Sequence, residues 1–234
     1  MPNPTDLPAA PGQIAAVRVW DLPTRIFHWL LATFVLALVI TGHVGGAVMD
    51  WHMRIGLMVL ALLVFRLIWG LIGGRWSRFA AFIYAPATLL RYLRGQHSPS
   101  EHFEVGHNPL GSLSVFGLLF LLLVQVATGL VADDEVATTG PLNKYVANAK
   151  ALAATAWHTG AGQWILIAMV VLHVAAIIVY KRRGVSLVKP MLVGDKHLLG
   201  DVPHSRDTWA TRLLALVLAL LCMTGAGLLA KLGG

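Results

Sequence analysis

Five long apolar segments, separated by polar stretches, account for most of the chain. They run near residues 26–45, 52–73, 110–131, 157–180 and 208–230. A helix needs about 20 residues to cross roughly 30 Å of hydrocarbon, and helices pair every backbone polar group internally, as lipid requires. The pattern therefore predicts an all-α integral membrane protein. Residues 79–93 are apolar but shorter and contain Pro86, so we expect them to lie at the membrane interface.

The composition agrees with this class of protein. Hydrophobic residues make up 57% of the chain and charged residues only 12%, whereas an ordinary soluble domain has about 25% charged residues. Lipid must therefore be the solvent for much of the surface. The single cysteine, Cys222, excludes an internal disulfide, and the chain lacks the C-x-x-C-H motif of covalently attached haem.

The pattern divides the chain into four parts. Residues 1–16 are rich in Pro, Ala and Gly, lack the features of a cleavable signal peptide, and are expected to form a disordered cytoplasmic N-terminus. Residues 17–185 hold the first four spans and form the main membrane domain. Residues 186–207 are expected to form a cytoplasmic loop, and 208–234 carry the fifth transmembrane helix.

Lysine and arginine gather in alternate connections between the spans. They precede the first span and fill the loops after the second and fourth, whereas 43–51 has none and 132–156 carries the acidic run Asp133–Asp134–Glu135. By the positive-inside rule, the N-terminus is cytoplasmic and the C-terminus lies outside. Basic loops that face anionic lipid explain the net charge of +7. The loops leave no room for a nucleic-acid-binding fold.

Four histidines near span ends are the candidate ligands of a cofactor. They are His28, His52, His158 and His173. Alternating span directions place His28 and His173 toward the cytoplasm, and place His52 and His158 toward the outside. His158 and His173 are separated by about 22 Å of helix rise and point to similar faces. Two opposed imidazoles are the axial ligands of a six-coordinate haem, which favours electron transfer. The sequence thus predicts two haem b groups, one between each pair.

Other histidines could replace a ligand in this arrangement. His43 is the alternative on the outer side and His107 is the alternative on the inner side. Each of the four preferred histidines, taken singly, could instead be a polar residue bonded to a neighbouring carbonyl. The mirror arrangement of all four favours the ligand interpretation.

Four sequence segments resemble the bacterial cytochrome b561 family, which includes the b-type cytochrome subunit of membrane nickel–iron hydrogenases. The segments are VRVWDLPTRIFHW, FRLIWGLIGGRWSRF, GHNPLG and WHTGAGQWILIAMVVLH, within residues 17–185. The resemblance implies a dihaem four-helix bundle in the bacterial inner membrane that exchanges electrons with quinone and a redox partner. Its ligand positions carry over onto His28, His52, His158 and His173.

This chain departs from the family pattern in two places. The two histidines of the fourth span are 15 residues apart, where 14 is expected, so a local bulge or a shifted ring angle is anticipated. The chain also has a fifth span, whereas hydrogenase subunits end in a polar cytoplasmic tail. That span is expected to pack on the bundle or to dock a partner.

Three arginines lie near the predicted haem levels and are candidate partners of haem propionates. They are Arg25, Arg54 and Arg66. Arginine suits carboxylates because its planar guanidinium binds them in a bidentate manner. A quinone pocket beside Trp29 or Trp69 is a further hypothesis. The acidic run 133–135 is either a solvated turn or a docking patch for a basic carrier such as a c-type cytochrome.

The preferred function is electron transfer between the quinone pool and a protein redox partner, either a periplasmic cytochrome c or an oxidoreductase subunit. The alternatives are a superoxide:quinone oxidoreductase and the membrane anchor of a hydrogenase-like complex. The family resemblance is also compatible with a homo-oligomer. A divalent-metal transporter would need Asp, Glu or Cys partners within the spans, which nearly lack them.

Overall fold

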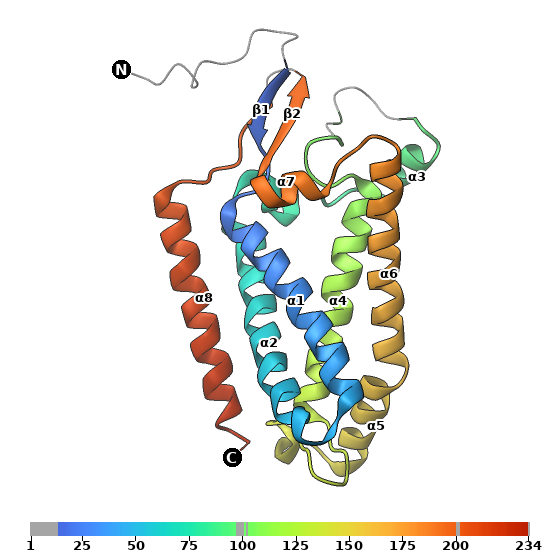
Figure 1. Ribbon diagram of the computed structural model, residues 1–234, viewed down its shortest axis with the longest axis vertical. Coiled ribbons are helices and arrows are strands. Elements are labelled where there is room, and N and C mark those ends of the chain that lie inside the picture. Colours follow the sequence, from blue (N-terminus) through green and yellow to red (C-terminus); the bar gives the residue numbers. More distant parts are fainter. Residues whose placement is uncertain (1–13, 97–100, 102, 200–201, 234) are drawn as a thin grey trace.

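The computed structural model describes residues 14–96, 101, 103–199 and 202–233 (Figure 1). The elements, in chain order, are β1 (Ile14–Arg18), α1 (Leu22–Val44), α2 (Met49–Ile72), α3 (Pro86–Leu93), α4 (Pro109–Val131), α5 (Asn148–Thr159), α6 (Ala161–Arg182), α7 (Val188–Val193), β2 (Asp195–Leu199) and α8 (Trp209–Ala230). Within the described residues, five helical stretches are long and apolar enough to cross a membrane. The predicted all-α membrane fold with a fifth C-terminal helix is confirmed.

Helices α1, α2, α4 and α6 form the bundle, and α5 extends α6 at one end (Figure 1). α1 packs on α2, α2 on α4, and α4 on both α5 and α6. α8 packs on the outer face of α2, where Ala215 and Cys222 join the same apolar cluster as Val59 and Leu63. The fifth span therefore packs on the bundle, one of the two roles expected for it.

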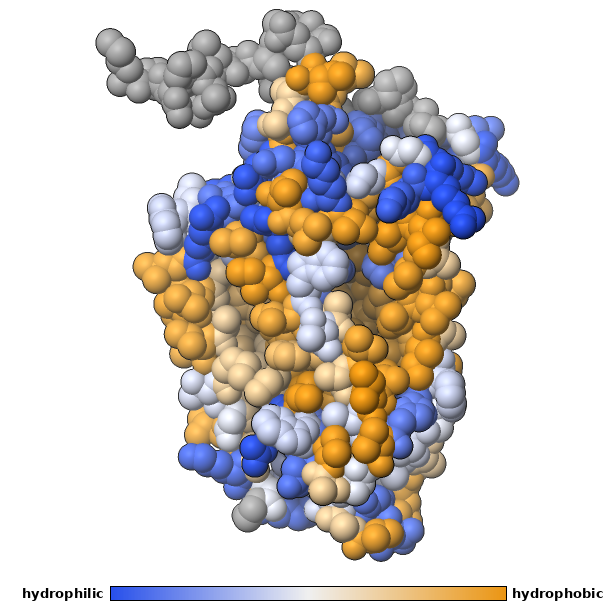
Figure 2. Space-filling model, in the orientation of Figure 1, coloured by the Kyte–Doolittle hydropathy of each residue, from blue (hydrophilic) through white to orange (hydrophobic). Residues whose placement is uncertain are grey.

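Large apolar side chains cover the middle of the molecule and point outward. Leu36, Phe120, Leu172 and Leu221 are each more than 60% exposed, although they come from four different helices. Figure 2 shows the apolar surface between two more polar ends. A soluble protein rarely exposes an apolar surface this extensive, so the surface is one that lipid covers.

Local caps define where the bundle helices begin. Asp21 caps α1 by accepting a hydrogen bond from Thr24 N at 2.8 Å, and Asn108 caps α4 by accepting one from Gly111 N at 2.8 Å. Both helices carry proline in the first turn, where a missing N–H costs nothing. The Asp21 carboxylate is fully buried and also accepts hydrogen bonds from Trp69, Gly74 and Ser77. It thereby ties the start of α1 to the end of α2.

One end of the bundle, here called the strand end, carries a small sheet. β1 and β2 pair in antiparallel register from Ile14↔Leu199 to Arg18↔Asp195. The disorder predicted for 1–16 is wrong for residues 14–16, which lie in β1, while residues 1–13 lie outside the described residues. The segment predicted as a loop, 186–207, contains α7 and β2. Five-residue strands this far apart in sequence give too weak a pattern to identify.

An ion-pair network joins the sheet to the start of α8. Arg18 contacts Asp195 at 2.6 Å and Asp207 at 2.9 Å, and Asp207 also contacts Arg212 at 2.9 Å. Asp207 accepts both arginines and is largely buried. The network therefore fixes where the fifth helix enters the bundle.

Candidate functional site

The structure brings the four predicted histidines together as two ring pairs, one toward each end of the bundle. His28 of α1 faces His173 of α6 with 6.5 Å between ring centroids, and we call this the strand-end pair. His52 of α2 faces His158 of α5 with 6.0 Å between centroids, and we call this the α5-end pair. These are the pairings that span topology predicts.

Both separations suit a metal bound between two imidazoles. An imidazole nitrogen lies about 2 Å from a metal that it binds and roughly 1 Å from the centre of its own ring, so two opposed ligands have centroids about 6 Å apart. The centroid distances of 6.5 and 6.0 Å are close to this value. In the described part of the chain, no three His, Cys, Asp or Glu side chains converge on a point. The geometry favours two-ligand axial coordination over a multi-ligand metal centre.

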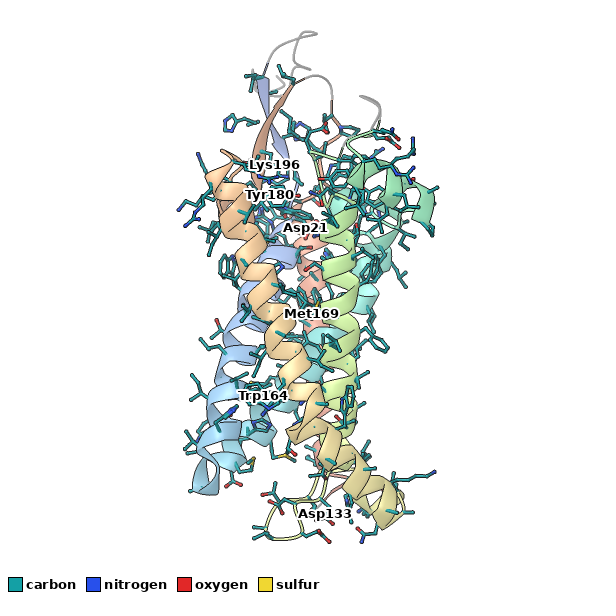
Figure 3. The ribbon with its side chains drawn as sticks, turned by 90° about the vertical axis from the view of Figure 1, so that its right-hand side faces the viewer. Asp21, Asp133, Trp164, Met169, Tyr180 and Lys196 are labelled. Carbon is teal, nitrogen blue, oxygen red and sulfur yellow. The ribbon has the colours of Figure 1, made fainter. Side chains whose placement is uncertain are left out.

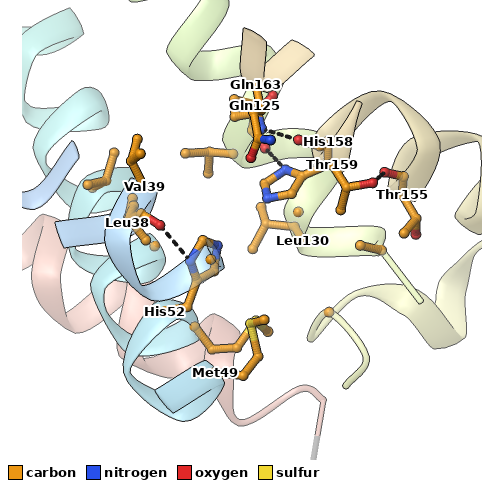
Figure 4. Close-up of a pocket in the computed structure, with 18 of the residues that line it drawn as sticks. Leu38, Val39, Met49, His52, Gln125, Leu130, Thr155, His158, Thr159 and Gln163 are labelled. Carbon is orange, nitrogen blue, oxygen red and sulfur yellow. Dashed lines mark hydrogen bonds between the residues drawn. The ribbon is translucent and has the colours of Figure 1, made fainter. Parts of the chain in front are cut away.

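Backbone carbonyls orient both rings of the α5-end pair (Figure 4). His52 Nδ1–H donates to Leu38 O at 3.1 Å, and His158 Nδ1–H donates to Gln125 O at 2.8 Å. Because a carbonyl only accepts, these bonds place the proton on Nδ1 and leave the Nε2 lone pair available for a metal. A bond from the second ring nitrogen to a carbonyl is typical of metal-binding histidines and increases the basicity of the nitrogen that binds the metal.

The same short sequence pattern on α1 and α4 forms the surfaces against which the rings of His52 and His158 pack. Thr41 and Gly42 follow Leu38 by three and four residues, and Thr128 and Gly129 follow Gln125 by the same spacing. A Cβ atom on Gly42 would lie 3.2 Å from His52 Cε1, and one on Gly129 would lie 2.9 Å from His158 Cε1. Glycine thus lets each ring lie against the neighbouring helix. We did not predict these contacts. The Thr-Gly dipeptide was a weak signal for them, because it also occurs as Thr224-Gly225 in the fifth span, which has no histidine.

A cavity of about 310 Å³ lies beside the α5-end pair and is lined by both of its rings. Its other walls are mostly apolar and come from α1, α2, α4, α5, α6 and the loop between α4 and α5. A Cβ atom on Gly56 would meet nothing within 4 Å. The volume lies within the range of small-molecule and cofactor sites, which are apolar with a few polar groups. The residues at this end therefore fit a flat apolar cofactor.

The strand-end pair has a different surrounding. His28 Nδ1 is buried and has no hydrogen-bond partner among the described residues, and His173 Nδ1 lies 3.3 Å from the hydroxyl of Ser114. Among the described residues, neither His28 Nδ1 nor His173 Nδ1 donates to a backbone carbonyl, as both Nδ1 atoms of the α5-end pair do. The two pairs share ring spacing but differ in what holds Nδ1.

The three predicted arginines occupy different environments. Arg66 is 3% exposed, its guanidinium lies 4.7 Å from the Phe79 ring centroid, and its Nη1 has no partner among the described residues. Arg25 instead donates from Nη1 to Leu192 O of α7 at 2.5 Å. Arg54 is exposed beside Trp51 and does not line the cavity. Arg25 Nε and Arg66 Nη1 are both buried without a partner among the described residues, but Arg66 is the more deeply buried of the two side chains.

The two alternative histidines have aromatic neighbours. His43 is exposed, lines the cavity, donates from Nδ1 to Val39 O at 2.8 Å, and lies beside Trp164. His107 packs between Trp20 and Phe82, with ring centroids at 4.8 and 4.5 Å. Burial lowers the pKa of His107 to about 3, with a smaller contribution from the charge of Arg66. His107 is therefore neutral at physiological pH.

The fourth predicted span is broken between its two histidines. α5 ends at Thr159, Gly160 has φ −103° and ψ −116°, and α6 begins at Ala161. A Cβ atom on Gly160 would lie 2.5 Å from the carbonyl oxygen of Ala156. The break lies two residues after His158, and the rings of His158 and His173 each pair with a histidine of the neighbouring helices. Figure 3 shows α6 along its length, from Trp164 near the break to Tyr180 at the strand end.

Comparisons with known proteins identify the family to which the chain is similar. A family model described as prokaryotic cytochrome b561 matches residues 19–194. The probable Ni/Fe-hydrogenase 1 B-type cytochrome subunit of Escherichia coli K12 is 24% identical over 190 residues, covering 67% of this chain and 80% of that protein. The probable Ni/Fe-hydrogenase B-type cytochrome subunit of Rhodobacter capsulatus is 24% identical, covering 80% of this chain and 83% of that protein. The subunit of the same name from Cupriavidus necator is 26% identical, covering 73% of this chain and 82% of that protein. No solved structure matches the chain.

Proposed function

This chain belongs to the prokaryotic cytochrome b561 family, and from that premise we propose that it is a dihaem membrane cytochrome that passes electrons between quinone and a protein redox partner. The proposal depends on one observation: the bundle holds two pairs of facing imidazoles, one pair toward each end. Within each pair the ring centroids lie about 6 Å apart. His28 and His173 would hold one haem b, and His52 and His158 the other. When bound, a six-coordinate haem supplies a reversible one-electron change at its iron.

The protein's own residues would orient the ligand rings, keep water away from the cofactor and balance the negative charge of its propionates. The carbonyls of Leu38 and Gln125 fix the tautomer and angle of the α5-end rings. The apolar side chains that line the cavity at the α5 end would keep water away from the cofactor. Arg66, buried with a free Nη1, is the proposed partner of a propionate at the strand end. The contacts of Arg25 and the exposure of Arg54 give no support for the same role in those two residues.

The distribution of charge supports an orientation in the bacterial cytoplasmic membrane. The strand end carries most of the basic residues, among them Arg75, Arg78, Arg91 and Arg183, and we propose that it faces the cytoplasm. The α5 end would then face the periplasm. A partner there, either a c-type cytochrome or an oxidoreductase subunit, would meet the α5-end pair. The names of the relatives favour a hydrogenase-like oxidoreductase as that partner.

The superoxide:quinone oxidoreductase alternative receives less support at this site. Among the residues that the structure describes, the cavity is lined by no lysine or arginine that could attract an anion, but it is lined by Asp134. Hydrogen bonds from the backbone N–H groups of Thr138, Val136 and Ala137 lower the pKa of Asp134 to about 2. Its carboxylate is therefore negative at physiological pH and would repel superoxide.

The deciding experiment is a reduced-minus-oxidised absorption spectrum of the purified protein with haem quantified per chain. The proposal expects a b-type α-band and two haems per chain, and alanine at any one of the four histidines should remove one of them. Protein that is folded but contains no haem would refute the proposal.

A further inference from the structure

The span that carries His158 is interrupted just after this residue, which leaves one of its backbone groups without a helical partner. α5 ends at Thr159, and Gly160 separates it from α6. The last four carbonyls of a helix have no donor within that helix, and His158 is among the last four residues of α5. Among the described residues, no backbone N–H group beyond the break donates to His158 O. This oxygen therefore needs a donor from another part of the chain.

The side chain of Gln125, on α4, supplies that donor. Its Nε2 donates to His158 O at 2.6 Å, while the backbone oxygen of the same glutamine accepts from His158 Nδ1 at 2.8 Å (Figure 4). One residue thus holds the histidine at two points, the ring and the main chain. Two hydrogen bonds from one residue fix the direction of the ring, whereas a single bond leaves the ring free to turn about it.

The surroundings of the Gln125 amide agree with this role. Because a carbonyl only accepts, the nitrogen end of the amide must face His158 O. The oxygen end, Oε1, is buried and has no partner among the described residues. A Cβ atom on Gly162 would lie 2.7 Å from Oε1, so a glycine two residues after the break makes room for the amide. The contact with His158 O thus determines the orientation of the amide.

In the described part of the chain, His158 alone among the four proposed ligands is held in this way. It is the only one that lies in the last four residues of its helix. His52 also donates to a backbone carbonyl, but the side chain of that residue, Leu38, has no polar atom. The helices that carry His28, His52 and His173 continue for more than a turn beyond each ligand. The second contact therefore occurs where the helix break requires it.

From these contacts we propose that the side chain of Gln125 is a positioning residue for the haem site at the α5 end: its bond to His158 O fixes the broken span at the ligand and so sets the angle of the imidazole. This inference rests on the proposed dihaem function. Without the bond, α5 would be free to turn at Gly160, and the ring would lose its angle. The strand-end site, whose ligands lie within continuous helices, would not be affected.

The test compares two substitutions of Gln125 in the purified protein. Gln125→Met keeps the length of the side chain and removes the donor, whereas Gln125→Asn keeps the amide but is one carbon too short to reach His158 O. The electron paramagnetic resonance spectrum of a low-spin haem depends on the angle between its two imidazole planes, and hydrogen bonds to the ligands set that angle. We expect both variants to shift the signal of the α5-end centre alone. Haem affinity at that site should fall about 10- to 100-fold, measured as transfer to a haem-scavenging protein.

Two controls identify the signals and separate this contact from a general loss of polarity. His158→Ala should retain only the strand-end haem and so gives the signal of that centre alone. Gln163→Met changes the same residue type beside the same cavity, but the Gln163 side chain makes no hydrogen bond within the described part of the chain. Both signals should therefore stay unchanged in Gln163→Met.

The inference is overturned if neither Gln125 variant shifts the α5-end signal, or if Gln125→Asn behaves as the wild type. It is also overturned if both centres change alike, because Gln125 would then support the bundle as a whole. Haem retained at the strand end shows that a variant has folded, and should one variant not fold, the other decides alone. A wild type with two haems and unchanged variants would leave the proposed function intact, whereas a wild type without haem would end both.

Discussion

A methyl group added at Gly129 should weaken the haem site proposed at the α5 end and spare the one proposed at the strand end. A Cβ atom there would lie 2.9 Å from His158 Cε1, while ordinary contact begins at 3.4 Å, so the ring must move by about 0.5 Å. The bond from His158 Nδ1 to Gln125 O is 2.8 Å long, and a shift of this size would stretch it to roughly 3.3 Å, beyond the usual limit. Loss of a hydrogen bond that orients a metal-binding histidine typically lowers metal affinity about 10- to 100-fold.

The assay is haem content per chain of Gly129→Ala after detergent purification and gel filtration. We expect it to fall from two toward one, with the lost component belonging to the α5-end pair. Gly117→Ala is the matched control on the same helix, because its Cβ would meet Met169 Cε at an ordinary 3.4 Å. Both changes raise helix propensity equally, so propensity cannot explain a difference between them. Equal haem content and identical spectra in the two variants would refute the reasoning.

Three further predictions concern the helix break, the ion-pair network and the alternative ligand. Gly160→Ala should lower the thermal unfolding temperature, because its Cβ would lie 2.5 Å from a carbonyl oxygen one turn earlier; an unchanged melting curve would contradict this. Burial alone would raise the pKa of Asp207, but its hydrogen bond to Arg212 lowers the pKa below the usual value. The contact thus stabilises the fold above about pH 4 and is lost as the pH falls; unfolding temperatures at pH 7 and pH 3 should differ more in the wild type than in Asp207→Asn. His43→Ala should keep two haems per chain while His52→Ala keeps one, and the reverse pattern would make His43 the ligand.

The features that could be predicted are those that a single segment specifies. Each apolar run is long enough to define a span alone, and the direction of each span then decides which histidine lies at which end. His28 and His173 could be paired in this way without knowledge of any contact. The 15-residue spacing in the fourth span also indicated an irregularity, which the structure locates at Gly160.

The features that could not be predicted depend on contacts between distant segments. β1 and β2 are five residues each, and neither has a pattern that selects the other as its partner. Arg25 and Arg54 have the right residue type near the right level, but the carbonyl of Leu192 engages the first and solvent exposure separates the second from the cavity. The strand pairing and the contacts of the two arginines depend on side-chain direction and on packing between distant segments. Neither can be derived from the spacing of residues in the sequence.

The pairing of β1 with β2 has a consequence for biogenesis. The first strand leaves the ribosome early, yet its partner at 195–199 and the Asp207 that binds Arg18 are made only after four spans have been synthesised. The strand end can therefore close only late, when the last loop has been translated. Until then Val17 and Val19, which are almost fully buried in the finished protein, remain uncovered. The assembling chain thus keeps one end open through most of its synthesis, until the segment that precedes its last helix has been made.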